Sequence, residues 1–576
     1  MTTVAEGLIE VLADLGVRTV WGVVGDALNP ITEALRQQDG MEWIGVRHEE
    51  VGAFAASAQA QLTGTLGVCM GTVGPGSIHL LNGLYDAAKS HAPVLAVCGQ
   101  VPLAEMGSDY FQEVNNDLLF TDVARFRFTL TSAEQAPRII EQAIQAAYAG
   151  PGVAVLTIPG DVGSLKLTSP VRVPRHVLDR PVATPSQQAV TEAAGLINAA
   201  QKVTLLVGIG AREARKQVLA LADRLAAPMV LTFKAKEGLE RDNPFQIGQS
   251  GLIGNPATKK AFDDTDVLLM LGTDFPYPDW LPEKATIIQV DRDATHLGRR
   301  TPLALGVVGD VDLFTQALLP LVAAKTDREH LDDSVAAYRK WGDRQKALTD
   351  PDLDATVLGK VRAVFDNPDE RIRPELLAEL IDTHAADDAV FTADTGMSAV
   401  WLARFVTFRG TRRLIGSFNL GSMANAMPHA LGAQATDPAR QVVAFCGDGG
   451  LTMLLGDLLT AVSYQLPVKL ICFNNGRLGM VKLEQEQGGL PEYGTELANP
   501  DLAAVGRACG LHGIRITDPD QLEAAVKETL AHPGPVLLDV VTNPDEIAFP
   551  PRTTPDQAWG LAIAKSKEVL RSRGEH

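Results

Sequence analysis

The sequence predicts an α/β fold with parallel sheets, arranged as three domains. Short apolar runs without polar alternation, for example residues 94–98 and 442–446, recur throughout the 576-residue chain. Such runs are typical of strands buried on both faces, as in parallel sheets covered by helices. They alternate with Ala- and Leu-rich helical stretches, and this alternation favours α/β layers. The length also predicts about three or four domains, at roughly 150 residues each.

Two stretches break this alternation and divide the chain. Residues 169–188 are rich in proline, and residues 343–374 are strongly charged and also carry prolines. Both compositions indicate linkers or surface excursions. We therefore expect a first domain at residues 1–170, a middle domain at 185–340, a third domain at 365–548 and a tail at 549–576. Further predicted strands lie at residues 153–158, 203–207, 267–271, 287–290, 389–393, 468–473 and 536–541.

Composition and charge exclude several classes of protein. The content of 46% hydrophobic and 21% charged residues excludes a disordered chain. A net charge of -19 argues against nucleic-acid binding, which needs a basic face. The five Cys form no C-x-x-C pair, so we expect buried, reduced thiols and a cytoplasmic protein. The acidic, amphipathic N-terminus does not resemble a signal peptide, so we expect none, and no apolar run reaches the ~18 residues of a membrane span.

The stretch 442–481 is the most informative part of the sequence. One predicted strand runs into a glycine-rich turn at 447–450, a helix follows, and a second strand ends beside Asn475. Glycines let the backbone approach a phosphate closely, and the N-terminus of the next helix favours negative charge. Asp448 and Asn475 supply hard oxygens of the kind that Mg²⁺ prefers. The pattern predicts a diphosphate and magnesium site, although a plain glycine turn beside a polar strand end would show the same glycines.

The pairing of these two motifs resembles a known family. Asp448 and Asn475 lie 27 residues apart, with a predicted strand before each. Upstream are Arg47-His48-Glu49 and the Gly-Pro-Gly turn at 74–76, and GSFNLGSMANAMP occupies 416–428. Together these segments resemble the thiamine diphosphate (ThDP)-dependent enzymes that act on 2-oxo acids, in the branch of pyruvate oxidase and acetolactate synthase. The resemblance covers nearly the whole chain.

The resemblance implies how ThDP and its metal would be held. Glu49 matches the carboxylate that activates the cofactor through its aminopyrimidine, and Met423 matches the apolar residue that props ThDP in its bent form. Taken alone, Glu49 could be a surface carboxylate at a helix start and Met423 a core residue. Asp448 and Asn475 would bind Mg²⁺. The other implied ThDP contacts are Gly421, Ser422, Gly449, Gly450, Gly476, Arg477, Leu478, Gly479, Met480 and Val481.

The resemblance also implies a substrate pocket. Phe111 would shape an apolar slot for the methyl group of pyruvate. His79 and Gln112 would donate hydrogen bonds to charge that develops during the reaction. Glu484 matches a carboxylate of the family's pocket, close to Val481. An isolated histidine such as His79 is, however, more often structural than catalytic.

The middle domain is implied to bind FAD. Gly208 and Gly210 follow a predicted strand, but Glu213 stands where a dinucleotide fingerprint has its third glycine. That fingerprint is therefore absent, and the expectation rests on three segments at strand ends that resemble flavin-contacting segments. The alternative is a nucleotide fold without flavin. The implied FAD contacts are Ser250, Gly251, Leu252, Ile253, Gly254, Thr273, Asp274, Phe275, Pro276, Tyr277 and Asp291.

Residues 111–113, 251–254 and 416–428 look most like the quinone-linked enzymes of this branch. The implied reaction is oxidative decarboxylation of pyruvate to acetate and CO₂, with electrons passing through ThDP and FAD to a membrane quinone. The resemblance further implies a homotetramer, in which Glu49 of one chain faces Asp448 and Asn475 of another. A phosphate-dependent oxidase that uses O₂, an acetolactate synthase and a non-catalytic paralogue are the alternatives.

A lipid quinone requires contact with the membrane, and the tail 549–576 could provide it. Trp559, Ile563 and Leu570 have near-helical spacing among basic residues, which is consistent with a helix lying at the membrane surface. We therefore expect a peripheral protein at the inner face of the cell membrane. A solvated helix packed on the body is the alternative. Two features depart from the family pattern, because the tail is short and Met480 replaces an aromatic residue.

Overall fold

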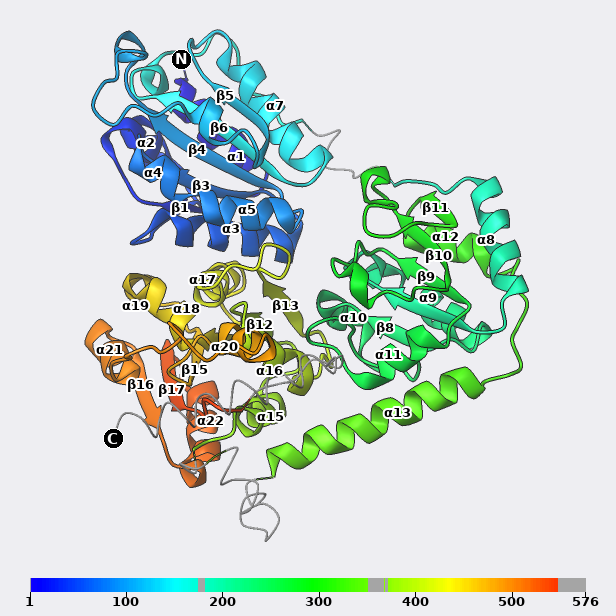
Figure 1. Cartoon of the computed structure of the whole chain (residues 1–576). Helices are drawn as coiled ribbons and strands as arrows, with labels where there is room; N and C mark the ends of the chain where they lie inside the picture. Colours follow the sequence, from blue (N-terminus) through cyan, green and yellow to red (C-terminus); the bar gives the residue numbers. More distant parts are fainter. Residues whose placement is uncertain (1, 175–181, 351–366, 368–370, 547–576) are drawn as a thin grey trace.

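Three parallel β-sheets, each covered by helices, form the molecule (Figure 1). The computed structural model describes residues 2–174, 182–350, 367 and 371–546. Every strand pair in the three sheets is parallel. The predicted α/β fold with three parallel-sheet domains is therefore confirmed.

The first domain contains a six-stranded sheet with the strand order β2-β1-β3-β4-β6-β5. Its central strands are buried along their whole length, as the continuous apolar runs predicted. The strands are β1 (Thr19–Gly22), β2 (Glu42–Gly45), β3 (Gly67–Gly71), β4 (Val94–Gln100), β5 (Ala124–Thr129) and β6 (Val153–Pro159). The helices are α1 (Val4–Asp14), α2 (Asn29–Gln37), α3 (Glu49–Thr63), α4 (Pro75–His79), α5 (Leu81–Lys89), α6 (Asn116–Leu119) and α7 (Ala136–Ala149).

The middle domain contains a five-stranded sheet with the order β11-β10-β9-β7-β8. The strands are β7 (Val203–Val207), β8 (Met229–Leu231), β9 (Val267–Leu271), β10 (Thr286–Asp291) and β11 (Leu305–Val308). The helices are α8 (Gln187–Ala199), α9 (Arg215–Arg224), α10 (Lys236–Leu239), α11 (Pro256–Asp263), α12 (Val311–Leu318) and α13 (Glu329–Lys346). The expected end of this domain at residue 340 falls inside α13, which continues into the charged stretch that the sequence indicated as a linker.

The third domain contains a six-stranded sheet with the order β13-β12-β14-β15-β17-β16. The strands are β12 (Val390–Ala393), β13 (Arg413–Gly416), β14 (Val442–Gly447), β15 (Lys469–Asn474), β16 (His512–Ile516) and β17 (Val536–Val541). The helices are α15 (Pro374–His384), α16 (Met397–Phe405), α17 (Ala426–Thr436), α18 (Asp448–Met453), α19 (Leu458–Ser463), α20 (Gly479–Gln487), α21 (Leu502–Cys509) and α22 (Leu522–Ala531).

All five Cys lie among the described residues. All five Cys are free, as expected, but Cys509 is only half-buried whereas the other four are buried. Among the described residues, we find no helix that combines the length and the apolar character needed to cross a bilayer. The tail 549–576, where the sequence predicted a membrane contact, lies outside the described residues.

The first and third domains share one hydrophobic core, in which α3 packs against α17 (Figure 1). Both helices are rich in small residues, which lets their backbones come close together. A Cβ added at Gly432 of α17 would lie 2.3 Å from the backbone oxygen of Ala55 in α3. A glycine is therefore required at this crossing, and the close contact fixes α3 relative to the third domain.

A buried carboxylate joins the middle domain to the third domain. Glu237 of α10 accepts hydrogen bonds from Arg212, from Arg413 Nε at 2.5 Å and from the Leu414 backbone N–H at 2.9 Å. Its side chain is only 5% exposed. Breaking a buried pair of this kind is expensive because charges remain without a partner away from water.

Replacing Glu237 by Ala is expected to destabilise the protein by about 3 kcal/mol, since Arg212 and Arg413 would lose a shared buried partner. Glu213→Ala is a matched control, because Glu213 also pairs with Arg212, at 2.9 Å, but is 86% exposed. That change is expected to cost less than about 1 kcal/mol. Differential scanning calorimetry of both variants measures the difference, and equal shifts in the thermal midpoint would contradict the assignment.

Candidate active site

One large cavity opens where strands of the middle and third sheets end. Its volume is 1610 Å³, and it is lined by the segments that follow β7, β9 and β10 on one side and β12, β14 and β15 on the other. Part of α5 and residues 122–125 and 148–153 of the first domain also line it. Ligands of open parallel sheets bind at the carboxyl ends of strands, where such loops converge. Sites for a single small ligand usually measure about 300–1,000 Å³. This cavity is therefore large enough for more than one cofactor.

Asp448 is fixed at the first position of α18, directly after β14. Its Oδ1 accepts a hydrogen bond from the Gly449 N–H at 3.0 Å, and its Oδ2 accepts from the Gly476 N–H at 2.7 Å and from Asn499 Nδ2 at 2.6 Å. Burial raises the pKa of Asp448 to about 6, although these three donors oppose the shift. The carboxyl group is therefore mostly ionised at neutral pH and is held in one orientation.

Asn475 lines the same cavity as Asp448, from the end of the neighbouring strand β15. Its Oδ1 accepts a hydrogen bond from the Arg477 N–H at 3.0 Å, which turns the side chain toward the loop that follows the strand. A carboxylate and an amide oxygen at adjacent strand ends are the hard donors that suit Mg²⁺. The donor set therefore fits the metal site that the sequence predicted.

The backbone near Asp448 leaves room for phosphate groups. Gly396, Gly421 and Gly447 all line the cavity. A Cβ added at Gly396 would meet nothing within 4 Å, and at Gly421 or Gly447 its nearest contact would be 3.9 Å away. Gly396 and Gly421 also have positive φ values, of 142° and 83°, which favour glycine. These positions present bare backbone to the cavity, as binding of a diphosphate requires.

Asp394 is a buried joint at the same edge of the third sheet. Its Oδ1 accepts from the Ala426 N–H at 2.9 Å, and its Oδ2 accepts from the Gly447 N–H at 3.1 Å. Burial raises the pKa of this carboxyl group to about 7. Asp394 thus ties the end of β12 to the start of α17 and the end of β14, and it lines the cavity together with Thr395.

Most of the predicted ThDP contacts of the third domain line the cavity, whereas Ser422 and Gly476 do not. The Ser422 side chain instead accepts a hydrogen bond from Asn82 of the first domain at 3.0 Å. Met480 and the substrate candidate Glu484 reach the cavity from α20. The predicted residues that line it here are Gly421, Met423, Asp448, Gly449, Gly450, Asn475, Arg477, Leu478, Gly479, Met480, Val481 and Glu484.

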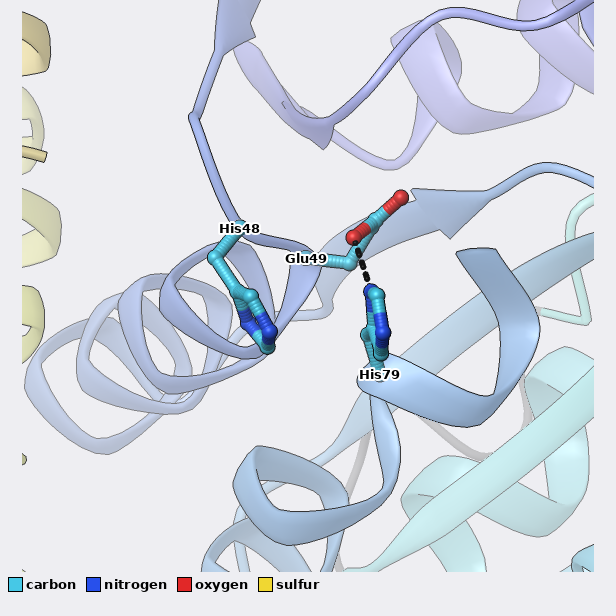
Figure 2. Close-up of side chains that lie close together, drawn as sticks. All are labelled: His48, Glu49 and His79. Carbon is cyan, nitrogen blue, oxygen red and sulfur yellow. Dashed lines mark hydrogen bonds and ion pairs between the residues drawn. The ribbon is translucent and has the colours of Figure 1, made fainter. Parts of the chain in front are cut away.

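The predicted residues of the first domain form a separate group. Glu49, the first residue of α3, is buried, and its Oε2 lies 3.0 Å from Nδ1 of His79 (Figure 2). His79 stacks on His48 with a ring-centroid distance of 4.4 Å. Phe111 is 79% exposed, and Gln112 has a φ of 68°. None of the four predicted residues Glu49, His79, Phe111 and Gln112 lines the cavity of its own chain.

The predicted FAD contacts lie on the middle-domain side of the cavity. Asp291 ends β10, and its Oδ1 accepts from the Asp293 N–H at 2.9 Å and lies 3.2 Å from Nδ1 of His296. Gly251 and Gly254 are not part of the lining. The predicted residues that do line this side are Ser250, Leu252, Ile253, Thr273, Asp274, Phe275, Pro276, Tyr277 and Asp291.

Basic residues on this side were missed by the sequence analysis. Arg292, Arg299, Arg300 and Lys234 all line the cavity. Arg299 and Arg300 pair with Asp274, the latter at 3.5 Å. Arginines beside a nucleotide cleft are the usual partners of phosphate groups, so the donor set fits the diphosphate of FAD. Arg292 directly follows Asp291 and could have been noticed, whereas Lys234 lies in a short turn without a distinctive pattern.

Family comparisons cover all three domains. Residues 2–119 match the N-terminal TPP binding domain of thiamine pyrophosphate enzymes, residues 190–318 match the central domain, and residues 394–540 match the C-terminal TPP binding domain. The chain belongs to the thiamine pyrophosphate enzyme family. Thiamine pyrophosphate is the same compound as ThDP, so the family resemblance stated from the motifs is confirmed at this level.

Similar members of this family carry different names. YdaP of Bacillus subtilis (strain 168), whose name describes a thiamine pyrophosphate-containing protein, is 37% identical over 99% of this chain and 96% of its own. A pyruvate oxidase of Lactiplantibacillus plantarum is 31% identical over 93% of this chain and 88% of its own. The large subunit of acetolactate synthase isozyme 2 of Escherichia coli (strain K12) is 32% identical over 95% of this chain and 96% of its own.

Replacing Asp448 by Ala is expected to weaken ThDP binding in the presence of Mg²⁺ by at least about a hundredfold, because even residues that only support a metal ligand contribute 10–100-fold. Asp457→Ala is the matched control, since Asp457 is also buried but does not line the cavity. Isothermal titration with ThDP and Mg²⁺ compares the two. Similar affinities for both variants would show that Asp448 does not hold the metal.

Proposed function

We propose that this chain oxidises pyruvate to acetate and CO₂, with ThDP, Mg²⁺ and FAD as cofactors and a quinone as the electron acceptor. The observation that carries the proposal is the single cavity, which joins the Asp448 and Asn475 edge of the third domain to the Asp291 edge of the middle domain. A shared cavity allows an electron pair to pass from a site of decarboxylation to a flavin nearby. The balanced reaction consumes pyruvate, water and quinone and yields acetate, CO₂ and quinol.

The cofactor supplies chemistry that side chains lack. Bound ThDP provides an electron sink for the pair left behind when CO₂ departs, which no amino-acid side chain offers. Asp448 and Asn475 would hold the metal, in the same cavity that would hold the diphosphate. Glu49 would hold or release a proton beside the aminopyrimidine, and its contact with His79 at 3.0 Å holds the carboxylate in place. Glu484 and Val481 border the space left for pyruvate.

We also propose that each active site is completed by a second copy of the chain, within a homotetramer. Glu49 and His79 do not line the cavity of their own chain, although the proposed chemistry needs them beside the cofactor. Apolar residues near them are exposed: Phe111 by 79%, Tyr110 by 48% and Ile78 by 42%. A surface of this kind marks a binding site for another protein. If this surface docks at the cavity of a second chain, Glu49 and His79 of one chain would lie beside Asp448 and Asn475 of the other.

The choice of acceptor rests on sequence resemblance alone, at residues 111–113, 251–254 and 416–428. The relatives named pyruvate oxidase and acetolactate synthase have similar identities to this chain, so both activities are outcomes that an assay must separate. A lipid quinone would require a peripheral position at the inner face of the cell membrane. The residues proposed for that contact, in the tail 549–576, lie outside the described residues.

The decisive assay follows reduction of a soluble quinone by pyruvate, using purified protein with and without ThDP, Mg²⁺, FAD and lipid vesicles. We expect stoichiometric acetate and CO₂, and activity that depends on all three cofactors. Oxygen uptake that requires phosphate would instead identify a phosphate-dependent oxidase. Acetoin recovered after acid treatment would identify an acetolactate synthase. Either result, without quinone reduction, refutes the proposed acceptor.

Mixing two inactive variants tests the shared active site. Glu49→Gln is expected to bind ThDP but to lose most activity, and Asp448→Ala is expected to lose ThDP binding. When the two are unfolded and refolded together, mixed dimers contain one site with both residues intact. About a quarter of the sites should then regain activity by random pairing. A mixture that remains as inactive as the separate variants contradicts completion of the site by a second chain.

A further inference from the structure

A buried polar chain connects the first domain to the loop that carries Met423. It begins at Asp86 of α5, which is completely buried between the first and third domains. Oδ2 of Asp86 accepts a hydrogen bond from the Ser57 hydroxyl at 2.9 Å and lies 3.0 Å from Nε2 of His429. Nδ1 of His429 lies 3.0 Å from Oδ1 of Asn425. All of these residues have no exposed surface.

Backbone contacts fix the orientation of the Asn425 amide. Its Oδ1 accepts from the Ser417 N–H at 3.0 Å, and its Nδ2 donates to the Ser422 carbonyl at 2.7 Å. The reverse orientation would place donor against donor and acceptor against acceptor. The atom that faces His429 is therefore an oxygen, so Nδ1 of His429 must donate to it.

His429 consequently donates from both ring nitrogens, to Asn425 and to Asp86. An imidazole with two donors is positively charged, and Asp86 is its negative partner. Burial opposes ionisation of Asp86, but His429 and the hydrogen bonds around the carboxylate outweigh it and lower the pKa of Asp86. The two groups form a completely buried ion pair whose far end clamps Asn425.

The clamp acts on a loop with strained backbone. Residues 417–425 contain two positive φ values, 83° at Gly421 and 60° at Ala424. For alanine, this conformation is strained, so the surroundings must hold it. Asn425 bonds to both ends of the bend, and Asn82 holds Ser422 at 3.0 Å from the first domain. Met423, between Ser422 and Ala424, is thereby presented to the cavity.

We propose that Asp86, His429 and Asn425 are positioning residues, which keep the 417–425 loop bent so that Met423 supports ThDP from the cavity wall. This inference rests on the proposed binding of ThDP in the cavity. In Asp86→Asn, an uncharged amide replaces the carboxylate that lies 3.0 Å from Nε2 of His429. The ring is then held less firmly against Asn425, which loosens the clamp without removing any atom from the loop.

The test measures how fast the C2 proton of bound ThDP exchanges with deuterium, in fully loaded protein and without pyruvate. Asp86→Asn and Asn425→Ala are expected to slow this exchange between about tenfold and a hundredfold, since a displacement of ~1 Å has effects of this size. The dissociation constant of ThDP should change by less than about threefold, because Asp448 and the bare backbone glycines are untouched.

Gln434→Ala is the matched control for lost stability. Gln434 is buried in α17, the helix that also carries His429. It donates hydrogen bonds to three backbone carbonyls just beyond the C-terminal end of α17, at the opposite end from the 417–425 loop. Gln434→Ala should lower the thermal midpoint, yet the C2 proton of bound ThDP should exchange at the wild-type rate. If Asp86→Asn and Asn425→Ala also exchange at the wild-type rate, or if Gln434→Ala is as slow as they are, the positioning role is refuted.

A milder variant covers the case in which these proteins do not fold. Asn82→Ala removes the other tie to Ser422, together with the hydrogen bond that Asn82 donates to Glu50 Oε1 at 2.7 Å, and it leaves the buried contact between Asp86 and His429 intact. It should slow the exchange by about tenfold. An unchanged exchange rate in Asn82→Ala then overturns the proposal. The exchange requires no pyruvate, flavin or electron acceptor, so it can be measured even if the protein does not oxidise pyruvate. If the chain binds no ThDP, the proposed function itself is refuted.

Discussion

The parallel direction of the strands is the constraint on which the whole arrangement depends. In a parallel sheet every strand delivers its carboxyl end to the same edge, so loops from distant parts of the sequence meet there. The middle and third sheets turn these edges toward a common space, which places Asp448 opposite Asp291 although 157 residues separate them in the chain. The buried contact of Glu237 with Arg413 and Leu414 then joins the middle domain to the third domain.

The sequence was sufficient for the strands and insufficient for the walls of the cavity. Apolar runs such as 203–207 and 267–271 coincide with β7 and β9, because burial on both faces forces continuous hydrophobicity. Asp448 and Asn475 were recognisable because glycines and strand ends accompany them. Which loop residues turn inward could not be inferred, since that depends on tertiary hydrogen bonds: Ser422 turns to Asn82 and leaves the cavity to its neighbour Met423.

Two buried clusters of charged residues lie at boundaries between domains, and each joins a different pair of domains. Glu237 joins the middle domain to β13, and Asp86 with His429 joins the first domain to α17. Buried ion pairs contribute little net stability, because the loss of hydration offsets their attraction. They fix the relative orientation of the two domains instead, because a buried pair is satisfied in only one geometry and is broken when one domain shifts along the other. The apolar core shared by α3 and α17 stabilises the association of the first and third domains, and the buried charges fix how the domains are aligned.

The glycine crossing of α3 and α17 extends its influence along the first of these helices. With 15 residues at ~1.5 Å each, α3 behaves as a stiff rod about 22 Å long, and Glu49 stands at its tip. A larger side chain at position 432 would press on the backbone of Ala55, about 9 Å along the helix from Glu49, and would displace Glu49 together with the helix. Random mutagenesis should therefore recover bulky substitutions at Gly432 that inactivate the protein although it remains folded.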